Sequence, residues 1–96
     1  MKTTKIYIDG YDKFESIDDF KFSLIHGREI VIVWDGIEYT ILKESDNNDK
    51  FTICQANKPE TENVFDTVEN LLEFALKTGE KLKDIITQAE VNWRNL

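Results

Sequence analysis

Residues 28–43 read REIVIVWDGIEYTILK and hold the strongest local structural signal in the chain. Two runs rich in β-branched and aromatic residues flank Asp35-Gly36, the dipeptide favoured in two-residue type I′ turns. The stretch therefore predicts an antiparallel β-hairpin. Because the turn has two residues, its register places large side chains together on one face, which we expect to line the core. These side chains are Ile30, Ile32, Trp34, Ile37, Tyr39 and Ile41.

The second face of this hairpin is more apolar than a fully solvated sheet face requires. It carries Val31, Val33, Glu38, Thr40 and Leu42. We expect a helix or a partner to cover part of it. A second copy of the chain is one alternative cover, as it is for an exposed strand edge, but we expect a monomer.

A strand and a helix are predicted before the hairpin. Residues 4–8 read as a short first strand. Ser16 followed by Asp19 is typical of a helix N-cap with an acid in the first turn, and Gly27 suits the left-handed position just past a helix end. These signals predict a helix over residues 17–26.

A third strand, a charged loop and two helices are predicted after the hairpin. Residues 51–56 extend the meander, and the polar segment NKPETENVFD follows as a loop. A helix capped by Asp66 or Thr67 should end at Gly79. Apolar residues at helical spacing over residues 82–93 predict a second, amphipathic helix.

These elements predict one two-layer α+β domain over residues 1–96. The expected order is β-α-β-β-β-α-α, an antiparallel meander with a short helix before the hairpin and two C-terminal helices packed on the sheet. A chain of 96 residues supports a single hydrophobic core, and neither a repeat nor a linker divides it.

The sequence predicts neither a membrane-spanning segment nor a secretory signal. No apolar run approaches the roughly 20 residues that span a bilayer, and the start of the chain lacks the apolar stretch and cleavage site of a secretory signal. The single cysteine, Cys54, can form no internal disulfide, which fits a reducing compartment. We expect a cytoplasmic protein.

Residue types that carry catalysis or bind metals are scarce. The one histidine, His26, lies at an expected helix end, where an imidazole interacts with the helix dipole. No nucleophile motif surrounds Cys54, which we expect to be a small buried hydrophobe. The acidic turn after the hairpin fails as an EF-hand because Lys50 and Phe51 occupy a ligand and a turn position. We therefore expect no enzyme activity, no metal and no cofactor.

The net charge of −7 is concentrated in the middle of the chain. Residues 44–73 hold eight acids and two bases, for −6, against −2 for residues 1–43 and +1 for residues 74–96. A negative field repels phosphate groups, so direct binding to nucleic acid or to an anionic membrane is not expected. The charge favours a basic protein surface as the partner.

Six carboxylates of this acidic segment are the candidate partner-binding residues. They are Asp46, Asp49, Glu60, Glu62, Glu69 and Glu73. If they converge on one surface, they present a track of negative charge to a partner's lysines and arginines. The alternative is that they serve only solubility and the helix dipole.

A family resemblance covers most of the chain and rests on three segments. They are GREIVIVWDGIEYTI at residues 27–41, DDFKFSLIH at residues 18–26 before it, and VENLLEFALKTGEKLKDII at residues 68–86. These motifs resemble those of a group of small proteins from Gram-positive bacteria and their prophages. The shared positions serve turns, caps and core, so no active-site residue carries over: they are Gly27, Gly36, Tyr39, Gly79 and Leu82.

The resemblance implies a setting in which small acidic proteins inhibit host defence, anti-CRISPR proteins that mimic nucleic acid among them. It points to a phage or mobile-element inhibitor of a nucleic-acid-handling defence enzyme, such as an RNA-guided nuclease. An immunity or antitoxin protein that neutralises a basic toxin follows the same charge logic. A housekeeping structural module fits the structural nature of the motifs, and a small enzyme using His26 or a carboxylate pair is the last alternative.

Overall fold

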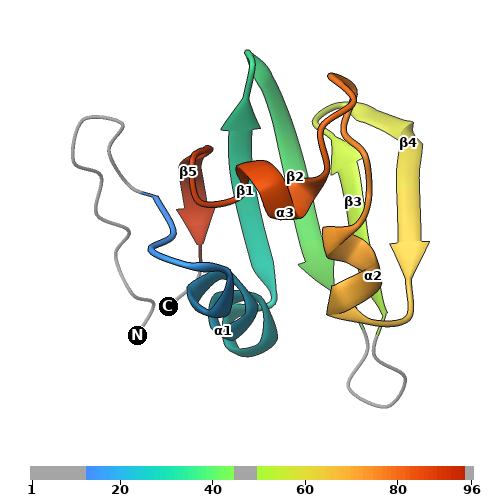
Figure 1. The fold of residues 1–96 in the computed structure, drawn as a ribbon. Helices are drawn as coiled ribbons and strands as arrows, with labels where there is room; N and C mark the ends of the chain where they lie inside the picture. Colours follow the sequence, from blue (N-terminus) through green and yellow to red (C-terminus); the bar gives the residue numbers. More distant parts are fainter. Residues whose placement is uncertain (1–12, 45–49, 95–96) are drawn as a thin grey trace.

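The computed structural model describes residues 13–44 and 50–94, which form a five-stranded antiparallel sheet and three helices (Figure 1). This arrangement confirms the predicted α+β class. The strand order across the sheet is β4-β3-β2-β1-β5. The strand predicted at residues 4–8 lies outside the described residues. In chain order the elements are α1 (Ile17–Gly27), β1 (Glu29–Trp34), β2 (Ile37–Lys43), β3 (Phe51–Gln55), β4 (Lys58–Phe65), α2 (Val68–Leu72), α3 (Leu82–Ile85) and β5 (Glu90–Arg94).

The strands β1 and β2 form the predicted hairpin in the predicted register. Trp34 pairs with Ile37 across the turn. Asp35 and Gly36 have φ values of 54° and 76°, as a type I′ turn requires. The expected core face is confirmed, because its six residues are either buried or packed against the buried core: Ile30, Ile32, Tyr39 and Ile41 are buried, and Trp34 and Ile37 are partly buried.

The helix α1 begins and ends close to where the sequence predicts. The Ser16 hydroxyl accepts a hydrogen bond from the backbone N–H of Asp19 at 3.1 Å, which confirms the N-cap. The predicted C-terminal cap is wrong by one residue, because Gly27 is still helical and Arg28 takes the left-handed conformation with φ 73°. The Arg28 guanidinium donates to the backbone carbonyl of Glu44 at 2.8 Å and helps to hold this conformation.

Two edge strands lie where the sequence predicts a loop and a helix. The strand β4 occupies most of the expected loop and pairs with β3. The helix predicted through residue 93 extends too far, because α3 ends at Ile85 and residues 90–94 form β5, antiparallel to β1. The helix before it is also shorter than predicted. It is capped by Thr67 and ends at Leu72, and Gly79 lies in a later turn with φ 95°.

All three described helices lie on the same side of the sheet (Figure 1). The helix α1 packs on β1, β2 and β5, and α2 packs on β3 and β4. None of the three is long and apolar enough to cross a membrane. Over the described residues, no helix covers the opposite face of the sheet. The helix side and its loops add to the core Phe20, Leu24, Leu71, Leu82, Ile85 and Ile86.

Candidate protein-binding surface

The carboxylates that the sequence proposes for partner binding are divided between elements. Asp46 and Asp49 lie outside the described residues. The other four are Glu60 and Glu62 on the edge strand β4, and Glu69 and Glu73 on and just after α2. The structure therefore does not bring all four to one element.

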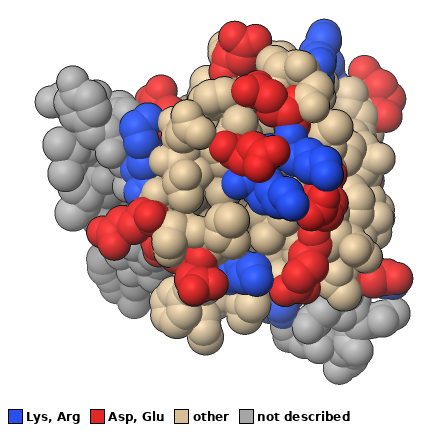
Figure 2. Space-filling view, viewed as in Figure 1, with Lys and Arg blue, Asp and Glu red and all other residues tan. Residues whose placement is uncertain are grey.

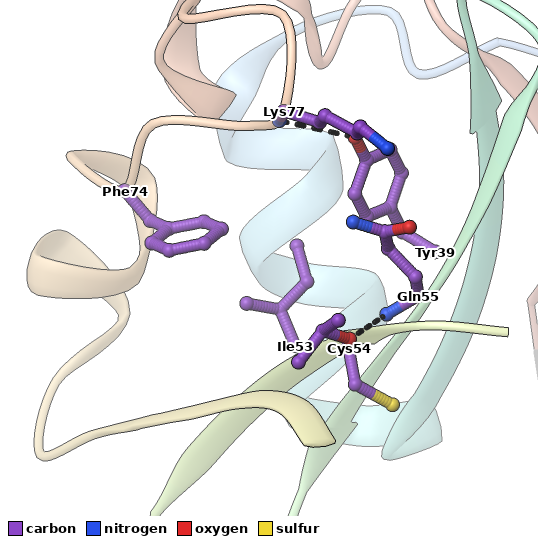
Figure 3. A pocket seen from close by; sticks show the side chains of 7 residues that line it. Tyr39, Ile53, Cys54, Gln55, Phe74 and Lys77 are labelled. Atoms are coloured by element: carbon purple, nitrogen blue, oxygen red, sulfur yellow. Dashed lines mark hydrogen bonds between the residues drawn. The ribbon is translucent and has the colours of Figure 1, made fainter. Parts of the chain in front are cut away.

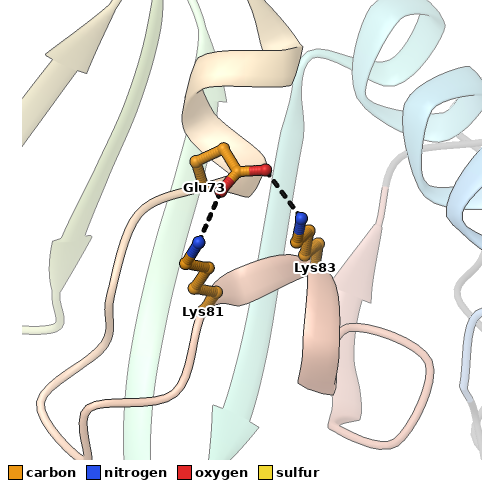
Figure 4. A network of polar contacts seen from close by, with 3 residues as sticks. All are labelled: Glu73, Lys81 and Lys83. Carbon is orange, nitrogen blue, oxygen red and sulfur yellow. Dashed lines mark hydrogen bonds and ion pairs between the residues drawn. The ribbon is translucent and has the colours of Figure 1, made fainter.

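The carboxylates at α2 are held by lysines. Glu69 lies 3.2 Å from Lys21. The two carboxylate oxygens of Glu73 accept hydrogen bonds from Lys81 at 2.8 Å and Lys83 at 2.7 Å (Figure 4). These bonds, with Lys81 first, lower the pKa of Glu73 to about 2. On this helix side of the molecule, lysines and arginines lie among the carboxylates (Figure 2), so much of the negative charge is compensated locally.

The opposite side of the sheet, which no described helix covers, forms a surface that we call the open sheet face. It consists of the strand residues that alternate with the core residues and point away from the helices. Its uncharged centre contains Val31, Val33, Thr40, Leu42, Cys54 and Trp93. Its charged residues are Glu29, Glu38, Glu62 and Glu90.

All described charged side chains of the open sheet face are acidic. By strand register, no lysine or arginine among the strand residues with described side chains points to this side. Within residues 13–44 and 50–94, none of the four glutamates forms an ion pair. The open sheet face therefore carries uncompensated negative charge, whereas the carboxylates at α2 are paired with lysines.

The sequence predicts only part of this surface. It makes Glu62 a candidate partner-binding residue and places Glu38 on the second hairpin face without a role. Glu29 could have been found from the same alternation, because it is in phase with Val31. Glu90 could not, because its segment was predicted to be helical.

A small pocket lies between β3 and the segment that follows α2 (Figure 3). Ile53, Phe74 and Tyr39 surround it, and the Tyr39 hydroxyl accepts a hydrogen bond from the backbone N–H of Lys77 at 3.3 Å. The thiol of Cys54 points away from Phe74 in Figure 3. The volume of about 30 Å³ gives room for about one or two water molecules, whereas small-molecule pockets usually measure roughly 300 to 1,000 Å³.

The histidine and the cysteine lie on opposite sides of the sheet. His26 is in the last turn of α1, where its ring lies 4.2 Å from that of Phe22. Cys54 is on the open sheet face, where burial, and then the charge of Glu62, raise the pKa of its thiol and favour the neutral form. The two residues therefore do not form a nucleophilic pair. Over the described ranges, no cluster of histidine, cysteine and carboxylate side chains could hold a metal ion.

The fold and its surface charge define a small acidic α+β domain. Comparison of the chain with protein-family models, with curated proteins and with solved structures finds no match. The sequence resemblance to small prophage-associated proteins therefore stays a prediction.

Proposed function

We propose that the chain is a non-enzymatic binding protein whose acidic surface docks on a basic protein, as an inhibitor of a nucleic-acid-handling defence enzyme. The observation that supports this proposal is the charge of the open sheet face. Four glutamates lie there without an ion pair to any described residue, and no described lysine or arginine side chain of the strands shares the face.

Proteins that bind nucleic acid neutralise phosphates with lysine and arginine side chains. The same side chains can pair with surface carboxylates, so an acidic protein can occupy a basic nucleic-acid site. The glutamates of the open sheet face are available for such pairs. Glu69 and Glu73 are not equally available, because a partner would first have to displace the lysines that already hold them.

The net charge of −7 supports a protein partner over a nucleic acid. A negative field steers a basic protein towards the chain and repels a phosphate backbone.

The test is a retention experiment with the purified chain as bait and a nuclease-treated lysate of its cell of origin. We expect a basic nucleic-acid-binding enzyme to be retained at low salt and released at high salt, because salt screens exposed charges. Added nucleic acid should displace the bait, and the purified enzyme should lose activity when the chain is added.

The matched control is a variant with Glu38→Gln, Glu62→Gln and Glu90→Gln, which removes charge and keeps side-chain size. Retention that is insensitive to salt, to nucleic acid and to these substitutions would contradict the proposal. Retention of a basic toxin instead of an enzyme would contradict the defence-enzyme assignment and would identify an immunity-type protein.

A further inference from the structure

The open sheet face has an apolar centre as well as acidic residues around it. Val31, Val33 and Leu42 are only partly buried, although valine and leucine are usually shielded by a second layer of structure. We propose that this face is the docking surface and that its occupant is a basic amphipathic helix of the partner protein. The inference rests on the proposed function and adds to it the surface and the shape of the partner.

The spacing of the glutamates along β1 fits a short helix. Glu29 lies opposite Leu42 at one end of the face, and Glu38 lies opposite Val33 at the other end. These two rows are four residues apart along β1, which is about 13 Å at about 3.3 Å per residue. An α-helix rises about 1.5 Å per residue, so about nine residues span the distance.

The spacing of the glutamates across the sheet fits the width of a helix. Glu38 on β2 and Glu90 on β5 both lie opposite Val33, one on each side of β1. Strands are about 4.8 Å apart, so β2 and β5 are separated by about 10 Å, close to the diameter of a helix with its side chains. A helix lying over β1 can contact Val31 and Val33 with its apolar stripe and place a lysine or arginine beside each of the two glutamates.

The charge of the face argues for a basic occupant over a second copy of this chain. In a symmetric pair, the same four glutamates would face one another with no described basic side chain of the strands between them. Like charges brought together in this way oppose binding. The acidic residues of the open sheet face are therefore complementary in charge to a helix with basic flanks.

The probe for this inference is a synthetic helical peptide of about twelve residues, with leucines along one stripe and lysines on both flanks. Its control has the same composition in scrambled order. Backbone amide resonances of the isotope-labelled chain are followed during titration. We expect saturable shifts on β1, β2 and β5, with binding at least about tenfold weaker for the scrambled peptide.

A pair of double variants locates the binding site. Glu38→Lys with Glu90→Lys reverses two charges of the open sheet face, and Asp18→Lys with Asp84→Lys makes the same change in net charge on the helix side. The affinity of the first variant for the peptide should be at least about tenfold lower than that of the unmodified chain. The affinity of the second variant should stay within about threefold of it. Amide spectra of both variants report whether the fold is kept.

Four results would overturn the inference. The first three are no shift at millimolar peptide concentration, shifts that map to the helices, and equal peptide affinity of both double variants. The fourth is equal affinity for the scrambled peptide, because charge alone would then explain binding. If the lysate retention stays salt-sensitive while any of these results holds, only the docking inference fails. If retention is insensitive to salt, the proposed function itself fails.

Discussion

Ile41 shows at the scale of one residue how the sheet is held to the helices. It lies in β2, is fully buried, and pairs with Ile30 and Ile53 in the neighbouring strands. We expect Ile41→Ala to lower the free energy of unfolding by about 2 to 5 kcal/mol, because the site loses buried methyl groups and gains a cavity. Urea unfolding measures the change.

The control for this change is Val64→Ala in β4, where the valine is 58% exposed. Its effect on the free energy of unfolding should stay within about 0.5 kcal/mol. Equal losses for the two variants would mean that Ile41 is not a core residue.

Glu73 gives a pH-dependent prediction. Its pKa is lowered from 4.5 to about 2 by Lys81 and then Lys83 (Figure 4). A lowered folded-state pKa stabilises the fold above the unfolded pKa, and the contribution is lost as the pH falls towards 2. The difference in Tm between the unmodified chain and Glu73→Gln should therefore be present at neutral pH and shrink below about pH 4.5.

The expected size of this effect is small, because all three side chains are about half exposed and salt screens the two ion pairs. Thermal unfolding of both proteins across the pH range, at low salt, is the measurement. A Tm difference that does not change with pH would show that the carboxylate charge has no role.

Glu73, together with Glu69, also explains why the candidate site is only partly predictable from the sequence. The sequence shows that Glu69 and Glu73 are acidic and exposed, but Lys21 reaches Glu69 from another helix. Lys81 and Lys83 reach Glu73 because the chain turns back after α2. Neutralisation by distant residues is a tertiary property, so acidity alone did not reveal which carboxylates remain unpaired.

At the scale of elements, the hairpin was predictable because its signal is local. The Asp35-Gly36 turn fixes the register, and the register fixes which residues face the core. A variant tests this directly. Gly36→Ala should lower the free energy of unfolding by about 1 kcal/mol or slightly more, because the residue has φ 76°, although an added Cβ would meet no atom within 4 Å.

The control at the same turn is Asp35→Asn, since asparagine tolerates the φ of 54° equally well. Urea unfolding should show this variant to be as stable as the unmodified chain. If Gly36→Ala were equally stable, the turn would not require a left-handed residue at this position.

The last strand, β5, was not predictable because its segment fits both a helical spacing of apolar residues and a strand that pairs with β1. Leu82, Ile85 and Ala89 have helical spacing, and all three are buried as that pattern predicts. The chain nevertheless leaves the helix after residue 85, and the buried Val91 pairs with Ile32 on the edge of the sheet. Pairing with a distant strand overrides the local preference here.

The strand β4 was missed for the opposite reason. Its sequence KPETENVF has no apolar alternation, and most of its residues are exposed. A polar edge strand owes its conformation to the backbone bonds it makes with β3, which the sequence pattern does not report.

At the scale of the whole molecule, the glutamates of the open sheet face should keep copies of the chain apart. Replacing Glu38 and Glu90 with glutamine weakens the repulsion and leaves the apolar centre in place. We expect the unmodified chain to sediment as a monomer at neutral pH.

The glutamine variant should associate at neutral pH, and sedimentation velocity compares it with the unmodified chain. A variant with Asp18→Asn and Asp84→Asn, on the helix side, is the control and should remain monomeric. Equal association of the two variants would mean that net charge alone, and not this face, keeps the copies apart.

The pairing of residue 30 with residue 94 also constrains how the chain folds while the ribosome makes it. The hairpin emerges first, but β1 keeps an unpaired edge until residues 90–94 have left the exit tunnel. At about 5 to 20 residues per second, this interval lasts several seconds. During that time the free edge of β1 in the nascent chain can pair with a strand of another chain. Slower translation of residues 44–94 therefore lengthens the period in which the nascent chain is prone to aggregate.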